Sequence, residues 1–280
     1  MAVIVAAFVA SLLALISSPA GAAVSVTPTT VSGVDRYATP AKAATTAYSG
    51  GTNNVVLVSG ANYADGLAAA SLAGAVNGPV LLTAPGDMMG STGNAIGTLD
   101  AGVAGTMNVY IVGGTSAVSA AQEAYLKDLK YTVTRVSGDD RYATANAVAA
   151  KVASISAFGT NPYNSKTTAF LVNGTSWADG LAVSGISFNK KFPVYLTDGA
   201  SLTASTKTAL DNSTHNIGRV IIVGGTSAVS AAVATEVATI KNGAAGTTAI
   251  EVQRIAGTDR YDTAVEVAKY AKKATALDGL

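Results

Sequence analysis

The chain has 280 residues, of which 49% are hydrophobic and 12% charged, and its 18 basic and 17 acidic residues leave a net charge of +1. This hydrophobe-rich, charge-poor composition excludes a disordered chain and predicts about two folded domains, and the basic residues form no run of the kind that binds nucleic acid. With no cysteine and a single histidine, His215, the sequence excludes disulfides, thiolate catalysis and a multi-histidine metal site.

The N-terminus is typical of a secretory signal peptide. Residues 3–16 are uninterrupted apolar residues, small residues follow, and 20–22 match the A-x-A cleavage pattern, although no Lys or Arg precedes the apolar segment. The segment is shorter than the roughly 20 residues that a membrane-spanning helix needs. We predict a signal peptide over 1–23, with a short membrane anchor as the alternative, and no membrane span in the mature chain.

Four sequence blocks recur in the same order along the rest of the chain. The block SGVDRYAT at 32–39 returns as SGDDRYAT at 137–144 and as AGTDRYDT at 256–263. Three further blocks, which contain ADGL, PVLLT or PVYLT, and IVGGTSAVS, lie at 56–70, 79–83 and 109–121 and return at 170–184, 193–197 and 220–232. Because all four blocks return in the same order, chance does not explain their recurrence. The sequence predicts repeats over 24–130 and 131–247 and an incomplete third repeat over 248–280.

Each copy alternates short apolar strands with Ala-rich segments of helical period. Buried strands are predicted at 55–58, 79–82, 109–112 and 220–223. Ser119 followed by Gln122 fits a capping box at a helix start. The alternation predicts an α/β fold of tandem Rossmann-like, flavodoxin-like repeats, each a parallel sheet with helices on both faces and, as we expect, strand order 2-1-3-4.

The third copy begins with a predicted strand over Ile250–Ile255 and a helix from Arg260 to about Ala274. One strand and one helix cannot enclose a core. We therefore expect this segment either to pack on another copy or to be part of a longer sequence.

Aspartate and arginine recur after the first two strands of each copy, as Asp35, Arg36 and Asp65 in the first and Asp140, Arg141 and Asp179 in the second. The carboxyl ends of parallel strands are where open sheets bind ligands. The aspartate before each arginine can cap a helix. The arginine can form a bidentate ion pair with Asp65 or Asp179, or it can contact a ligand directly.

The VGGTS sequences place Thr115, Ser116, Thr226 and Ser227 at two further strand ends. They match neither a dinucleotide-binding fingerprint nor a P-loop, so we predict no cofactor. One interpretation is a tight turn, and the other is contact with a polar ligand through hydroxyls and helix N-termini, which favour anions.

Two aromatic residues, Tyr63 and Trp177, occupy equivalent positions just before the two ADGL motifs. They either stack on sugar rings or lie partly buried against a neighbouring copy. The complete set of predicted ligand-binding residues is Asp35, Arg36, Tyr63, Asp65, Thr115, Ser116, Asp140, Arg141, Trp177, Asp179, Thr226, Ser227 and Arg260.

Catalysis has little support in these motifs. Asp35 and Asp65 could supply the two carboxylates of a glycosidase, but the adjacent arginine would lower their pKa rather than raise it. His215 stands in the non-duplicated polar segment NSTHN and is expected to be exposed. We predict no catalytic residue, no metal and no enzymatic activity.

The repeated blocks resemble the type 2 cell wall binding repeats of bacterial surface proteins, over nearly all the chain after Ala23. The resemblance implies Rossmann-like repeats, usually three around a pseudo-threefold axis, that hold S-layer or wall-associated proteins non-covalently to an anionic wall polymer. Here the third copy is shortened, and we find no effector domain in the sequence.

The predicted function is therefore non-covalent anchoring of a secreted protein at the cell surface, through an anionic or polysaccharide polymer of the cell wall. An envelope enzyme or a modifier of a peptidoglycan hydrolase is one alternative, and a self-assembling surface or S-layer protein is another. Besides the polymer, repeat-repeat packing or a homo-oligomer is expected as a partner interaction, and nucleic acid is not.

Overall fold

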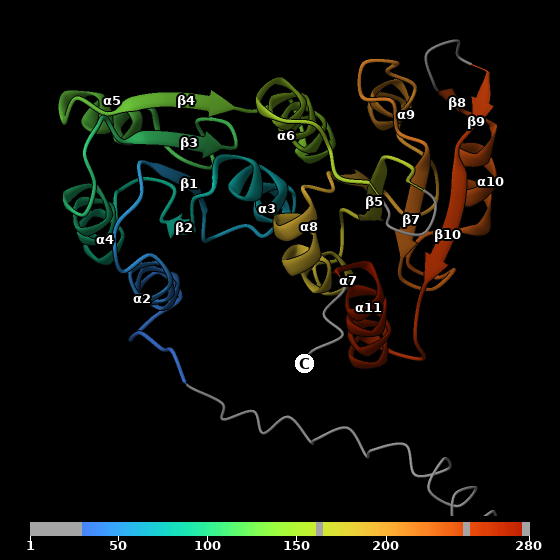
Figure 1. Ribbon diagram of the computed structural model, residues 1–280, viewed down its shortest axis with the longest axis horizontal. Helices are drawn as coiled ribbons and strands as arrows, with labels where there is room; N and C mark the ends of the chain where they lie inside the picture. The colour runs from blue at the N-terminus through green and yellow to red at the C-terminus, as the bar shows by residue number, and fades with distance from the viewer. Residues whose placement is uncertain (1–29, 161–164, 243–246, 276–280) are drawn as a thin grey trace, which may run out of the picture. The chain divides into compact units, whose positions relative to one another are not determined.

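The computed structural model describes residues 30–160, 165–242 and 247–275 (Figure 1). The predicted signal peptide at 1–23 lies outside these residues. In the part that the structure describes, no helix is long and apolar enough to cross a membrane.

The first sheet has four parallel strands in the order β2-β1-β3-β4. The strands are β1 (Asn54–Ser59), β2 (Val80–Thr83), β3 (Asn108–Val112) and β4 (Thr132–Val136). The helices that accompany them are α2 (Ala38–Ala47), α3 (Ala64–Val76), α4 (Gly90–Ala101) and α5 (Ala120–Asp128). This is the predicted order 2-1-3-4.

The second sheet repeats the arrangement, with parallel strands in the order β10-β7-β5-β6. Its strands are β5 (Thr168–Asn173), β6 (Val194–Thr197), β7 (Arg219–Val223) and β10 (Glu251–Ile255). Its helices are α6 (Arg141–Ile155), α7 (Ala178–Ala182), α8 (Ser184–Lys190), α9 (Ala204–Leu210) and α10 (Ala231–Thr239), with α11 (Arg260–Thr275) following β10. A short antiparallel pair joins β8 (Lys241–Asn242) to β9 (Thr248–Ala249). The fold class predicted from the sequence is confirmed.

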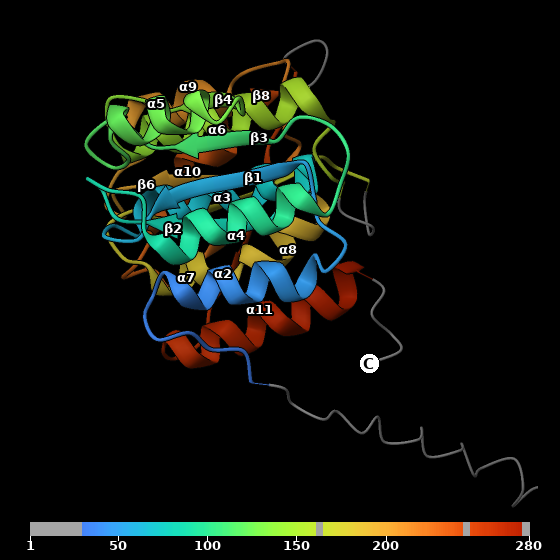
Figure 2. The same cartoon turned by 90° about the vertical axis from the view of Figure 1, so that its left-hand side faces the viewer.

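Alternate strand residues of the first sheet enter two different cores, as expected for a sheet covered on both faces. Val55 and Leu57 pack with residues of α2, α4 and α5, whereas Val56 and Val58 pack with α3 and with residues of the second sheet. Figure 2 shows α4 in front of the first sheet, with α2 below α4.

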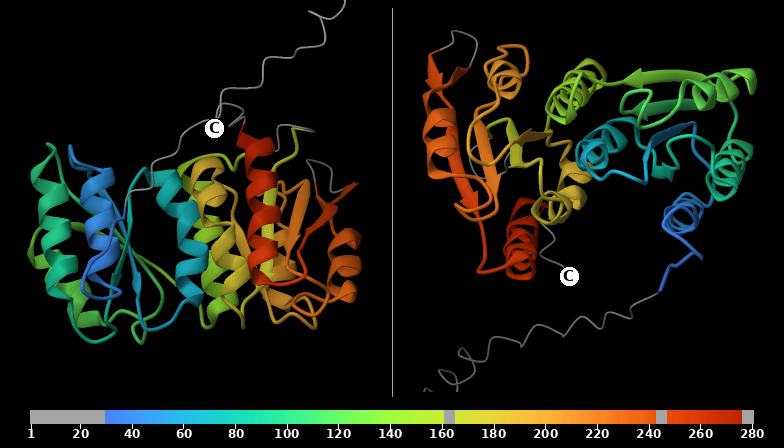
Figure 3. Two further views of the ribbon diagram at one scale, coloured as in Figure 1. Left: turned by 90° about the horizontal axis from the view of Figure 1, so that it is seen from below. Right: turned by 180° about the vertical axis from the view of Figure 1, so that it is seen from behind.

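Helix α3 joins the two halves of the structure. Its apolar residues surround the whole helix, which is typical of a helix buried on all sides. It contacts α6, α8 and β6, and the view from behind shows it beside α6 and α8 (Figure 3).

Each sheet takes its fourth strand from the beginning of the next sequence copy. Strand β4 precedes the second DRY motif, yet it pairs with β3 of the first sheet, and β10 precedes the third motif, yet it pairs with β7. The strand of the incomplete third copy therefore belongs to the second sheet, while α11 packs on α7 and α8. The repeat boundaries proposed from the sequence are thus offset from the sheets by one strand.

Candidate functional site

A pocket of about 340 Å³ opens at the carboxyl ends of the strands of the first sheet. Four of the predicted residues line it together, namely Asp65, Ser116, Asp140 and Arg141. We call this cavity the strand-end pocket. The prediction had not included other polar residues that line it, which are Ser59, Asn62, Asp139 and Thr144. Thr144 and Asp139 could have been found, because both lie within or beside the repeated DRYAT block.

Asp65 lies at the first turn of α3 with its carboxylate against the backbone of Gly113. A Cβ atom on Gly113 would come within 2.5 Å of Asp65 Oδ2, and Gly113 has a φ of +114°. The second copy has the same arrangement, with Gly224 at a φ of +110° and 2.5 Å between its would-be Cβ and Asp179 Oδ2. The first glycine of each VGG motif is therefore required by its backbone angle and by the neighbouring carboxylate.

The expectation that an arginine would lower the pKa of Asp65 is wrong in its net direction. Burial raises the pKa of the Asp65 carboxyl above its usual range, and the positive charge of Arg141 only partly offsets the rise. The pKa of Asp179 is also raised by burial and partly lowered by Arg260. In both cases the aspartate of one copy faces the arginine of the next copy, so the electrostatic partners come from both sides of a repeat junction.

The expected bidentate ion pair is not what the arginines form. Among the described residues, no ion pair joins Arg36, Arg141 or Arg260 to Asp65 or Asp179. Arg141 Nη1 instead donates to the carbonyl oxygen of Gly174 at 2.7 Å, and Arg36 does the same to Gly60 at 3.2 Å. Each of these two guanidinium groups thus hydrogen-bonds a backbone carbonyl of its own copy instead of the carboxylate of Asp65 or Asp179.

The aspartate before each arginine caps a helix, as predicted. Asp140 Oδ1 accepts a hydrogen bond from the backbone N–H of Ala143 at 2.7 Å, and Thr144 Oγ1 accepts one from Gly138 N at 3.1 Å. Corresponding bonds hold the starts of α2 and α11, through Asp35 and Thr39 and through Asp259 and Thr263. The repeated SGxDRYAT block is therefore a helix-start motif.

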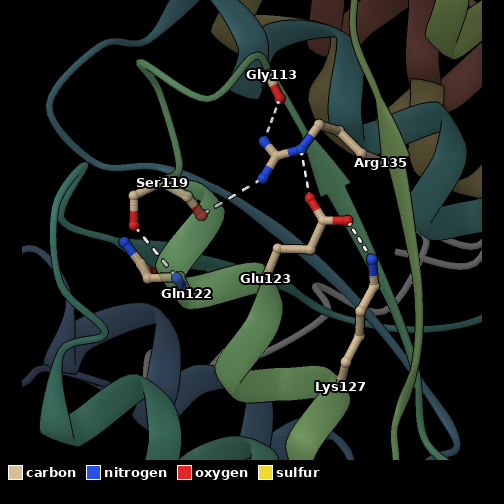
Figure 4. A network of polar contacts seen from close by, with 6 residues as sticks. All are labelled: Gly113, Ser119, Gln122, Glu123, Lys127 and Arg135. Atoms are coloured by element: carbon tan, nitrogen blue, oxygen red, sulfur yellow. Dashed lines mark hydrogen bonds and ion pairs between the residues drawn. The ribbon is translucent and has the colours of Figure 1, made fainter.

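An arginine that sequence reasoning missed supports the loop that carries Thr115 and Ser116 (Figure 4). Arg135 on β4 donates through Nη1 to the carbonyl oxygen of Gly113 at 2.8 Å and through Nε to Glu123 Oε2 at 2.8 Å. Glu123 also pairs with Lys127 at 2.7 Å, and hydrogen bonds from Lys127 and then Arg135 lower its pKa.

The second copy has the same support. Arg254 Nη1 donates to the carbonyl oxygen of Gly224 at 2.7 Å. Arg135 and Arg254 are separated by the same interval as Arg141 and Arg260, so alignment of the copies would have found them.

The predicted capping box at Ser119 forms only in part. Ser119 Oγ accepts from the backbone N–H of Gln122 at 3.2 Å, as expected. The Gln122 side chain does not return to Ser119 but donates to the carbonyl oxygens of Ala84 and Pro85. It ties the end of β2 to α5 instead. Thr115, Ser116, Thr226 and Ser227 are all exposed at these loops.

A second cavity of about 870 Å³ lies on the other side of the β1-α3 loop. It contains three further predicted residues, Arg36, Tyr63 and Trp177, over a floor of aliphatic side chains. We call it the apolar groove. Trp177 already has a partner for its ring, because the guanidinium carbon of Arg260 lies 5.6 Å from the ring centroid. The predicted ligand-binding residues of the first copy are thus divided between two cavities.

His215 is buried, and the expectation that it would be exposed is wrong. Only 7% of the residue is accessible, its Nδ1 lies 3.1 Å from the hydroxyl of Tyr195, and Phe158 packs edge-on against its ring. Burial lowers its pKa. Polar neighbours in the sequence suggested exposure, but the loop folds inward over β6.

No cluster of three or more His, Asp and Glu side chains within the described ranges could hold a metal.

The fold and the site together define this chain as a tandem α/β repeat protein, in which each repeat carries the same polar loops at its strand ends. The profile of cell wall binding domain 2 matches residues 30–123 and 135–234, and the chain belongs to this family.

Curated relatives and solved structures support the assignment to this family. The chain is 36% identical over 152 residues to the N-acetylmuramoyl-L-alanine amidase LytC of Bacillus subtilis, and 26% identical over 241 residues to the amidase enhancer of the same species. These matches cover 53% and 86% of the chain but 26% and 29% of the relatives, so the chain spans less than a third of their length.

Among solved structures, Cwp6 from Clostridium difficile superposes with a TM-score of 0.71 at 23% identity, over 89% of the chain and 38% of Cwp6. Cwp8 from the same species superposes with a TM-score of 0.68 at 28% identity, over 85% of the chain and 36% of Cwp8. The chain therefore carries cell wall binding domains, which associate it with the cell wall.

Proposed function

We propose that the chain anchors a secreted protein non-covalently at the cell surface by binding a saccharide polymer of the wall through its strand-end pockets. The observation that carries this proposal is the convergence of Asp65, Ser116, Asp140 and Arg141 on one pocket. The equivalent residues of the second copy are Asp179, Ser227, Asp259 and Arg260.

The charges around the strand-end pocket favour one part of such a polymer. Asp65, Asp139 and Asp140 bring three carboxylates to the lining, against the single guanidinium of Arg141. Carboxylates accept hydrogen bonds from sugar hydroxyls and repel phosphate. The carboxylates and Ser116 therefore contact hydroxyls, and Arg141 takes the anionic substituent of the repeating unit.

Two copies strengthen binding to a repetitive ligand without any new contact. Linking two weak sites raises apparent affinity by roughly 10²–10⁴-fold when both can engage one polymer. Loss of either pocket should therefore cost most of the wall affinity.

The test is co-sedimentation of the purified chain with deproteinised cell walls. Ser116→Trp places a bulky ring at the strand-end pocket, and Ser227→Trp places one at the equivalent position of the second copy, both from exposed positions. Each should weaken binding by about 10²-fold or more. Ser154→Trp, at an exposed position on α6, is the matched control and should bind like the parent chain. A parent chain that stays in the supernatant would overturn the proposal.

A catalytic role is the second candidate, because one relative is an amidase and another an amidase enhancer. An active site would place residues in one copy that the other lacks, whereas the Asp and Arg side chains discussed above occur in both. We propose that the chain targets and does not catalyse. Release of soluble fragments from purified peptidoglycan by this chain alone would reverse that choice.

A further inference from the structure

A cavity of about 470 Å³ opens between helices α4 and α5 of the first copy. The half-buried side chains of Met88 and Met89 and the exposed ring of Tyr125 form its apolar part, and Asp87 and Asn94 add polar groups to its lining. We call this cavity the methionine pocket. Its volume lies within the range of roughly 300–1,000 Å³ that is common for small-ligand sites.

The methionine pocket is open because glycines stand where side chains would fill it. A Cβ atom on Gly90 would have no neighbouring atom within 4 Å, and one on Gly93 would meet only Met88 Cγ, at 3.7 Å. Tyr125, across the cavity on α5, is 51% exposed. The aromatic ring is therefore accessible to a ligand in the pocket.

The second copy closes the same place with an ion pair. The PVLLT and IVGGTSAVS blocks align the two copies here, and they place Lys207 at the position of Gly93 and Glu236 at the position of Tyr125. Lys207 Nζ lies 2.7 Å from Glu236 Oε1, so this pair bridges α9 and α10. The fold thus accommodates a bridge between these two helices, and the first copy has an open cavity with an aromatic wall in its place.

The lining of the methionine pocket favours an uncharged sugar as its ligand. Among the described residues that line it, Asp87 alone is charged, so phosphate and carboxylate groups are repelled. A pyranose ring has apolar C–H faces that stack on an aromatic ring, and its hydroxyls form hydrogen bonds with carboxylates and amides. Tyr125 supplies the ring, Asp87 and Asn94 supply the polar groups, and the two methionines offer an adaptable apolar surface to the methyl group of an acetamido substituent.

We propose that the methionine pocket binds an uncharged N-acetylated hexosamine unit of a wall glycan, with Tyr125 against the face of the sugar ring. This inference rests on the proposed function for the source of the sugar, and it adds a subsite that the second copy lacks. The two cavities of the first copy share a loop, since Pro85 lines the strand-end pocket and Gly86 lines the methionine pocket. Ser119 Oγ holds this loop by donating to the carbonyl oxygen of Gly86 at 2.8 Å. A polymer that crosses the loop reaches both cavities.

NMR of the purified chain with isotope-labelled methionine methyl groups tests the proposal, with chitotetraose, a tetramer of N-acetylglucosamine, as the probe. Chitotetraose should shift the methyl signals of Met88 and Met89 in a saturable way. The signal of Met107, which is fully buried outside the pocket, should stay unchanged. Glycerol phosphate, an anionic probe, should shift neither pocket methionine. Chitotetraose that leaves both signals in place, or glycerol phosphate that shifts them, would overturn the proposal.

The ion pair of the second copy provides the sharpest variant. Gly93→Lys combined with Tyr125→Glu removes the ring and fills the cavity, and it should weaken chitotetraose binding at least about 10-fold. Because lysine favours a helix more than glycine does, the melting temperature should not fall. Gly97→Lys combined with Ala124→Glu introduces the same side chains at exposed positions of the same two helices outside the lining, and this control should bind like the parent chain. Unchanged binding by the first double variant would contradict the proposal.

Ser116→Trp separates this proposal from the proposed function. It obstructs the strand-end pocket, so it should weaken co-sedimentation with walls and leave the response of Met88 and Met89 to chitotetraose unchanged. If the parent chain stays in the supernatant but its methionine signals respond, the proposed function fails and the sugar site stands. If the chain sediments with walls and the methionine signals do not respond, the sugar site fails and the proposed function stands.

Discussion

Replacement of Gly113 by alanine should destabilise the fold, because two independent features of the structure demand glycine there. Its φ of +114° lies in a region that residues with a side chain rarely adopt, and such a conformation costs about 1–3 kcal/mol. The added methyl group would also lie 2.5 Å from Asp65 Oδ2 and 2.9 Å from the Cβ of Ala117. The carboxylate must move away, which adds to the cost.

Thermal unfolding followed by circular dichroism measures this effect. A loss of about 1–3 kcal/mol corresponds to a fall in Tm of roughly 2–12 °C, at about 2–4 °C per kcal/mol for a domain of this size. Gly114→Ala is the matched control, since no atom lies within 4 Å of its added methyl group, and a surface change of this kind should stay within about 0.5 kcal/mol. Equal melting temperatures for the two variants would refute the reasoning.

Three further predictions concern side chains that hold the loops in place. Because burial lowers the pKa of His215, the unfolded chain takes up a proton near pH 6.5 before the folded chain does. Stability should therefore fall as the pH drops below 6.5, and His215→Gln should flatten that part of a pH series of urea melts. Tyr195→Phe removes the hydroxyl that lies 3.1 Å from His215 Nδ1 and should cost about 1–3 kcal/mol at pH 7 in the same melts. Arg135→Ala should lower the free energy of unfolding by a similar amount, because it leaves the carbonyl of Gly113 without its donor. Lys127→Ala removes only an exposed ion pair and should lower it by under about 1 kcal/mol. Equal losses in the two variants would contradict the role of Arg135.

The periodic parts of the sequence were enough to predict the fold. The apolar runs at 55–58 and 109–112 became β1 and β3 because a strand buried on both faces needs continuous hydrophobic residues. The helix cap at Asp140 was also predictable, since a cap is a local interaction between residues three apart.

Contacts between residues far apart in the chain could not be predicted from the sequence pattern. The partner of Arg141 is a carbonyl 33 residues away, and nothing in the local sequence distinguishes it from Asp65. The burial of His215 depends on Tyr195 and Phe158, which come from a strand and a loop elsewhere in the chain. Even so, the strand-end pocket combines four residues that were chosen from their positions after strands.

The offset between sequence copies and sheets has a consequence for how the repeats work. Asp65 and Ser116 come from the first copy, whereas Asp140 and Arg141 follow β4 and open the second, so the strand-end pocket is completed only at a junction between copies. At the next junction, Arg260 of the third copy likewise acts on Asp179 of the second copy. A single sequence copy therefore does not supply all four of the predicted residues that line the strand-end pocket. The short segment of β10 and α11, which cannot form a core of its own, thus brings the charge of Arg260 to Asp179.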